Sequence, residues 1–136
     1  MRTYSEEEKD FLEKHDYIED RVQGHMLRYV LGGPEGSKTL VFMQGLDIQQ
    51  MFMRYVEVLE DSSRVLLIEY PTDTKTIDEQ LAVIHGLLEK LEIKDPVIIG
   101  ASDGGMFAQL YTRRYKDVSA LVLMATVTLD SEYLEP

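Results

Sequence analysis

The spacing of the hydrophobic residues changes near residue 39. Before that point, apolar and polar residues alternate over 17–22 and again over 25–31, and Gln23-Gly24 lies between the two stretches. Alternation with a period of two is typical of strands that bury one face, and a two-residue connection with glycine is typical of a hairpin. The sequence therefore predicts an antiparallel hairpin in the amino-terminal part.

A short helix is predicted before this hairpin, from Ser5 to Lys14. Ser5 and Glu8 have the spacing of a capping box, in which each side chain bonds a free backbone N–H of the other residue. We therefore expect Ser5 to be the amino-terminal cap of this helix.

After residue 39, uninterrupted apolar runs alternate with stretches that have helical spacing. The runs predict strands at 39–43, 64–70, 96–100 and 119–126, and the stretches between them predict helices at 48–59, 77–91 and 104–116. Uninterrupted runs suit strands buried on both faces. Such alternation predicts a parallel sheet with helices on its faces, connected by right-handed crossovers. The fold class is therefore α/β, a mainly parallel sheet with an amino-terminal antiparallel hairpin, and we expect one domain over 1–136.

Net charge and composition argue against several classes of binding partner and metal site. The 136 residues carry a formal net charge of −11, which argues against binding to nucleic acid or to an anionic membrane surface. The chain has no cysteine, so it forms neither a disulfide nor a zinc–thiolate site. No apolar run approaches the roughly 20 residues of a membrane span, and the polar, acidic start does not resemble a secretory signal. We therefore expect a cytoplasmic protein.

The chemistry is expected where the strands end, because ligands of such sheets bind beyond the carboxyl ends of the strands. One of these ends is Gly100-Ala101-Ser102-Asp103-Gly104, which joins a predicted buried strand to a predicted helix. A serine in a tight turn of this kind is lifted clear of the sheet, and the helix directs N–H groups and its positive dipole end toward it. Ser102 is therefore a candidate nucleophile.

A serine hydroxyl needs a general base and donors for the developing oxyanion. The N–H of Asp103 is one expected donor, and the N–H of Leu46, which follows Gln44-Gly45 at the end of an earlier strand, is the second. The flanking residues Gly100, Ala101, Gly104 and Gly105 are small, as a tight turn requires.

With these residues the sequence resembles the α/β-hydrolase family over about 17–128. Gly100-Ala101-Ser102-Asp103-Gly104 is similar to its nucleophile elbow, and TLVFMQGLD is similar to its strand and oxyanion loop, with Gln44 where the family often has histidine. The resemblance implies a serine hydrolase acting on an ester, an amide or a similar small molecule, with no cofactor and no metal. It covers only the first half of the family pattern, and the acid and histidine of the family's triad would follow later strands. We therefore expect the chain alone to be nearly inactive.

The histidines of the chain do not suit the role of base. On its predicted helix, His85 lies roughly 12 Å below the level of the site and is expected to pack between helices. His15 and His25 are expected far from Ser102. Asp130 and Glu132 follow the last predicted strand and are expected to be solvated charges rather than the catalytic acid.

The strand over Ser119 to Thr126 is predicted to be an apolar sheet edge without a charge or a proline to block pairing. Three outcomes follow: the chain is a fragment of a longer hydrolase, which we favour, or it pairs with a complementary polypeptide, or it forms a homodimer through this edge. A non-catalytic binding or association module is the alternative function. A nucleotide-binding protein is less favoured, because G-x-G-x-x-G is absent after the first parallel strand.

Overall fold

One six-stranded sheet organises the computed structural model, which describes residues 3–45 and 49–129. The strands are β1 (Ile18–Val22), β2 (His25–Gly32), β3 (Thr39–Met43), β4 (Arg64–Glu69), β5 (Val97–Ala101) and β6 (Ala120–Met124). They lie in the order β1-β2-β4-β3-β5-β6; β1 pairs antiparallel with β2 and β2 with β4, whereas β4, β3, β5 and β6 are parallel. The mainly parallel sheet with an antiparallel hairpin is therefore confirmed.

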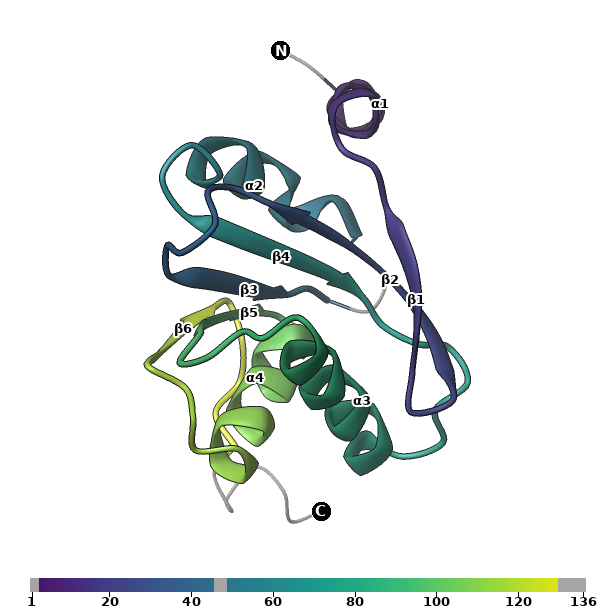
Figure 1. Cartoon of the computed structure of the whole chain (residues 1–136), viewed down its shortest axis with the longest axis vertical. Helices are drawn as coiled ribbons and strands as arrows, with labels where there is room; N and C mark the ends of the chain where they lie inside the picture. The colour runs from purple at the N-terminus through teal and green to yellow at the C-terminus, as the bar shows by residue number, and fades with distance from the viewer. Residues whose placement is uncertain (1–2, 46–48, 130–136) are drawn as a thin grey trace.

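Helices cover both faces of this sheet (Figure 1). They are α1 (Tyr4–Lys14), the 3₁₀ helix η1 (Gln49–Phe52), α2 (Met53–Leu59), α3 (Ile77–Lys90) and α4 (Asp103–Arg114). Helices α3 and α4 bury their apolar side chains in a core on one face, and α1, η1 and α2 bury theirs in a second core on the other.

The two cores explain why the central strands are apolar without interruption. Along β3, Val41 and Met43 lie in the first core, whereas Phe42 lies in the second, and all three side chains are fully buried. Side chains alternate across a strand, so a strand covered on both faces needs an apolar residue at every position.

Most boundaries differ from the predicted ones by one or two residues, and three differences have a visible cause or change the type of element. Helix α1 is capped by Thr3, not by Ser5, and the capping box pairs Thr3 with Glu6. The helix predicted over 48–59 begins as 3₁₀ turns before α2 continues it. Strand β6 ends at Met124 because Ala125 has a positive φ of 46°, which turns the chain out of the extended conformation.

The predicted apolar edge is present in the structure. Strand β6 pairs with β5 on one side only and is the last strand of the sheet. Val122 is 42% exposed and Leu123 is 39% exposed, although β5 beside it is mostly buried. An apolar strand with an unpaired edge is suited to pairing with a further strand.

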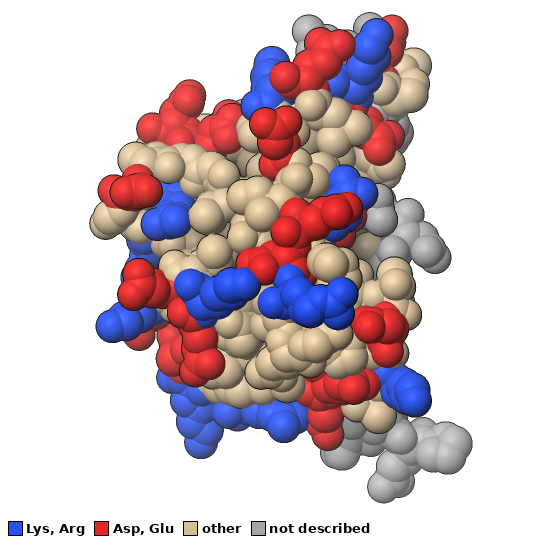
Figure 2. All heavy atoms as spheres, turned by 45° about the vertical axis from the view of Figure 1, so that its right-hand side comes forward, with Lys and Arg blue, Asp and Glu red and all other residues tan. Residues whose placement is uncertain are grey.

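The described surface mixes charges of both signs. Figure 2 shows basic side chains interspersed with acidic ones on the face in view. Among the described residues, no helix combines the length and the hydrophobicity that a membrane crossing needs.

Candidate functional site

Ser102 joins β5 to α4 in a backbone conformation that residues other than glycine rarely adopt. Its φ is 53° and its ψ is −128°. Side chains clash with the backbone at such angles, so a residue of this kind stays there only when its surroundings hold it. The backbone of Ser102 is held on both sides: its N–H donates to the Met124 carbonyl at 3.1 Å, and its carbonyl oxygen accepts from the Thr126 hydroxyl at 2.7 Å and from the Gly105 N–H at 3.0 Å.

The side chain of Ser102 is not used to cap the helix. Although Ser102 occupies the cap position of α4, its hydroxyl makes no capping hydrogen bond, and the residue is half-buried. The N–H of Asp103 belongs to the first turn of α4, where backbone donors have no partner within the helix. The Ser102 hydroxyl, which makes no capping hydrogen bond, therefore lies at the positive end of a helix dipole.

Close approach of α4 to the sheet explains the glycines around Ser102. A Cβ on Gly104 would collide with the carbonyl oxygens of Met43 and Gln44, at the end of β3. A Cβ on Gly100 would lie 2.7 Å from the Cα of Gly105, and one on Gly105 would lie 2.5 Å from the Thr126 side chain. These glycines let α4 start directly against the ends of β3 and β6.

Gly45, the second residue after β3, lies close to Ser102. A Cβ built on Gly45 would be 3.9 Å from the Ser102 hydroxyl oxygen, which is ordinary contact distance. Gln44 is 2% exposed and is held by two hydrogen bonds. Its side-chain nitrogen donates to the backbone carbonyl of Ile68 at 3.3 Å, and its backbone carbonyl oxygen accepts from the Tyr70 hydroxyl at 2.8 Å. Leu46, the expected second oxyanion donor, lies outside the described residues.

Tyr70 is a neutral donor at this position. Burial raises the pKa of its phenol, and the negative charge of Asp103 raises this pKa further. Its ring packs on Phe107 of α4, with 5.4 Å between the ring centroids. Tyr70 therefore ties the end of β4 to both the loop after β3 and the helix that follows Ser102.

Two cavities border Ser102 and the ends of the neighbouring strands. One of about 300 Å³ is lined by Ser102, Asp103 and Met106 of the elbow and by the segment 125–127 after β6. Another of about 300 Å³ lies at the ends of β3 and β4, and Gln44, Gly45 and Gln80 are among its lining residues. Gly45 lines the second cavity and lies close to Ser102, because a Cβ built on Gly45 would be 3.6 Å from the Cβ of Ser102.

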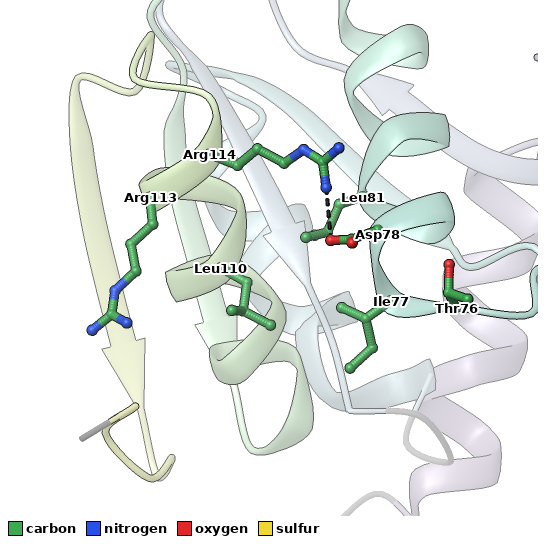
Figure 3. A pocket seen from close by; sticks show the side chains of 7 residues that line it. All are labelled: Thr76, Ile77, Asp78, Leu81, Leu110, Arg113 and Arg114. Carbon is green, nitrogen blue, oxygen red and sulfur yellow. Dashed lines mark hydrogen bonds and ion pairs between the residues drawn. The ribbon is translucent and has the colours of Figure 1, made fainter. Parts of the chain in front are cut away.

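A larger cavity of about 530 Å³ lies elsewhere, between α3 and α4 (Figure 3). The carboxylate of Asp78 and the guanidinium of Arg114 form an ion pair across it at 2.7 Å, over the apolar side chains of Ile77, Leu81 and Leu110. It contains neither a serine nor a histidine, so we do not place the chemistry there.

The structure pairs each histidine with residues other than Ser102. His85 stacks on Tyr115 with 3.9 Å between ring centroids, and its Nδ1 lies 2.9 Å from the Tyr111 hydroxyl, which confirms its packing between α3 and α4. His15 contacts Glu60, and His25 contacts Asp73 and Glu79. Asp130 and Glu132 lie outside the described residues. Within the described part of the chain, no group of His, Asp or Glu has the arrangement of a metal site.

Sequence reasoning missed three residues that shape this region: Thr126, Tyr70 and Gln80. Tyr70 and Thr126 are the last residues of the strands predicted at 64–70 and 119–126, and they follow the observed strands β4 and β6. Polar side chains at the carboxyl ends of parallel strands mark the site edge of the sheet, so the sequence contained this signal. Gln80 is three residues after Ile77 and one before Leu81, and its position on the buried side of a helix was the signal.

Comparison with known proteins finds similarity at the level of structure. The sequence matches no protein-family model, and no curated protein matches it. The fold is similar to that of a membrane phospholipase A (TM-score 0.80, 17% identity, 93% of this chain and 45% of that chain). It is also similar to naproxen esterase from Bacillus subtilis (TM-score 0.73, 16%, 87% and 47%) and to an α/β hydrolase from Novosphingobium aromaticivorans (TM-score 0.69, 21%, 80% and 43%). The chain thus spans about half the length of the structures it matches.

Proposed function

We propose, from the α/β-hydrolase fold that this chain has, that it carries the nucleophile of a serine hydrolase. In this proposal the Ser102 hydroxyl attacks the carbonyl carbon of an ester, an amide or a similar small acyl substrate. The attack forms a bond between the serine oxygen and the acyl carbon, the leaving group departs, and the hydroxyl proton passes to a general base. Water then releases the acyl group as an acid.

The strained backbone of Ser102 is the observation that carries the proposal. A serine at φ 53° and ψ −128° is held by hydrogen bonds from two segments, yet its hydroxyl caps nothing. Strain of this kind clusters at functional sites because the fold must maintain it at the expense of stability. A serine with a purely structural role in the turn would give no reason for the strain, since glycine adopts these angles freely.

The oxyanion donors are proposed to be the N–H groups of Asp103 and Leu46. The N–H of Asp103 is in the first turn of α4, and Gly45, which precedes Leu46, lies close to Ser102. Two backbone donors at one point, together with the helix dipole, stabilise the charge that develops on the carbonyl oxygen. Gly100 and Gly104 support this arrangement by letting the helix and the strands approach each other.

The base and the acid are proposed to come from residues other than those of this chain. His15, His25 and His85 each have hydrogen-bonding partners elsewhere in the fold. A further polypeptide segment would supply these residues and pair with the open edge of β6, where Val122 and Leu123 are exposed. Without the base, catalysis rests on binding and on the oxyanion donors, so the chain alone is expected to be slow.

Formation of a boronate adduct tests whether the site accepts a tetrahedral oxyanion on Ser102. Phenylboronic acid takes up a serine oxygen and becomes four-coordinate, with release of a proton to the buffer. We expect a four-coordinate boron signal by ¹¹B NMR with the unmodified chain and with Ser119→Ala, the control for another serine. Loss of this signal in Ser102→Ala would support the proposal, whereas no signal with the unmodified chain would contradict it.

A non-catalytic association module is the second candidate function. The engaged histidines favour it, because they leave Ser102 without a base among the described residues. In that case the exposed apolar edge of β6 is the functional surface, and no boronate adduct forms. Sedimentation analysis of the chain alone and of Val122→Lys shows whether this edge pairs copies of the chain, since a charge on the edge opposes pairing.

A further inference from the structure

Helix α1 is fastened to α2 by a largely buried contact between a histidine and a carboxylate. The side chain of His15, which ends α1, is 8% exposed, and that of Glu60, which ends α2, is 25% exposed. The Nε2 atom of His15 lies 3.0 and 2.9 Å from the two carboxylate oxygens of Glu60. Its Nδ1 atom lies 2.9 Å from the backbone carbonyl oxygen of Phe11. Both ring nitrogens therefore face oxygen atoms.

These contacts fix the number of protons that the pair holds. A backbone carbonyl oxygen can only accept, so Nδ1 of His15 carries a proton. An ionised carboxylate also only accepts, so the second contact needs a further proton, either on Nε2 or on Glu60. Without it, the lone pair of Nε2 would face the lone pairs of two oxygens at hydrogen-bond distance. The docked pair thus holds one proton more than a neutral imidazole beside an ionised carboxylate.

The surroundings of His15 favour a positive charge on the ring. His15 caps the carboxyl end of α1, where the helix dipole is negative. The ring of Phe11 stacks on that of His15 with 4.1 Å between the centroids, and an aromatic face attracts a cation. The extra proton is therefore well placed on His15, with Glu60 as its counter-ion.

This contact matters because little else fastens α1 to the molecule. Figure 1 shows α1 at one end of the molecule, next to the amino terminus. Among the described side chains of α1, only Phe11 is fully buried, in the second core. Ion pairs of Lys14 with Glu57 and of Arg54 with Glu7 also join the two helices, but Lys14 and Arg54 are 64% and 76% exposed. Exposed pairs of this kind stabilise little.

We propose that α1 is a pH-sensitive strap, held on α2 by the proton that His15 and Glu60 share. The docked contact needs this proton, whereas a released His15 and Glu60 bind it less firmly because neither has the other beside it. The docked state therefore binds more protons near neutral pH, and docking weakens as the pH rises through the range in which histidines lose theirs. Phe11 then leaves the second core together with α1.

Hydrogen exchange of the α1 amides measures the docking of this helix. A protection factor compares each exchange rate with that of an unstructured chain at the same pH, so it removes the direct effect of pH on exchange. We expect these factors to fall about tenfold or more from about pH 6 to about pH 9, because a charge-assisted hydrogen bond is lost. The ring ¹⁵N shifts of His15 should change over the same range. Factors that stay constant, or that change in a different range from the ring shifts, would overturn the proposal.

The Glu60→Gln variant separates the shared proton from a merely structural contact. An amide N–H of the new side chain donates to a neutral His15, so the contact no longer needs the extra proton. The α1 amides should therefore stay protected at both ends of the pH range, and the dependence on pH should disappear. A dependence that persists in this variant would show that the proton is not the one between His15 and Glu60.

Two further variants complete the test. His15→Gln removes the titrating ring, so the α1 amides should be less protected at about pH 6 and should show no dependence on pH. Glu89→Gln is the matched control, because it removes a carboxylate that lies 3.3 Å from His85 and leaves α1 unchanged. It should show the pH dependence of the unmodified chain. Loss of the dependence in Glu89→Gln would place its origin at His85 and contradict the strap.

Discussion

Replacing Ser102 by glycine and by alanine measures the strain at the elbow. Both substitutions remove a hydroxyl that makes no capping hydrogen bond, but only glycine adopts φ 53° and ψ −128° without a clash. An unfavourable conformation of this kind costs on the order of 1–3 kcal/mol. Glycine relieves this cost, but it also gives the unfolded chain more conformational freedom, which reduces the stabilisation by about 0.5–1 kcal/mol. We therefore expect Ser102→Gly to be more stable than Ser102→Ala by about 1 kcal/mol.

Urea denaturation followed by circular dichroism gives the two free energies of unfolding. Ser62, an exposed turn residue without a positive φ, provides the matched control pair. There the order should reverse, with Ser62→Gly less stable than Ser62→Ala, because the backbone is not strained and only the entropy of glycine remains. If Ser102→Gly is no more stable than Ser102→Ala, Ser102 is not strained, and the observation that carries the proposed function is lost.

Three further predictions concern packing and titration. Gly104→Ala should lower the free energy of unfolding by at least about 1–3 kcal/mol, measured in urea, because the new Cβ collides with the Met43 carbonyl; an unchanged midpoint would contradict the close approach of α4. The hydrogen bond from Lys90 holds the pKa of Asp20 below its ordinary value, so Lys90→Met should raise this pKa in a ¹³C NMR titration, and an unchanged pKa would exclude the contact. Burial raises the pKa of Tyr17 to about 12. The unfolded chain ionises this phenol first, near its ordinary value of about 10, so stability should fall as pH rises above that value, and Tyr17→Phe should reduce this dependence in urea midpoints.

The sheet could be predicted because hydrophobic spacing reports directly on burial. The run over 39–43 is apolar at successive positions because each face of β3 packs in a different core. The same signal placed Ser102 between a buried strand and a helix, and the structure has β5 and α4 there. The similarity of the solved structures confirms the α/β-hydrolase fold that the motif resembles.

Features that depend on contacts between distant segments could not be predicted from local pattern. The hydrogen bond from Thr126 to Ser102 requires the chain to turn at Ala125, a residue whose type does not favour a positive φ. The cap of α1 was predicted at Ser5, whereas the structure has it at Thr3. The sequence pattern does not decide between two possible capping residues that lie two positions apart. The shared cavity of Gln44 and Gln80 depends on the approach of α3 to the end of β3, which no spacing along the chain expresses.

Mass spectrometry after treatment with a fluorophosphonate tests most directly whether Ser102 is a nucleophile. The chain would be incubated with the probe alone and with added imidazole, which can act as a general base. The modified peptide would be identified beside the Ser102→Ala variant. We predict slow modification without imidazole, and faster modification with it, of a single residue, Ser102. Rapid labelling of Ser102 without imidazole would mean that the chain contains its own base. Labelling of another residue, or none in the presence of imidazole, would contradict the account.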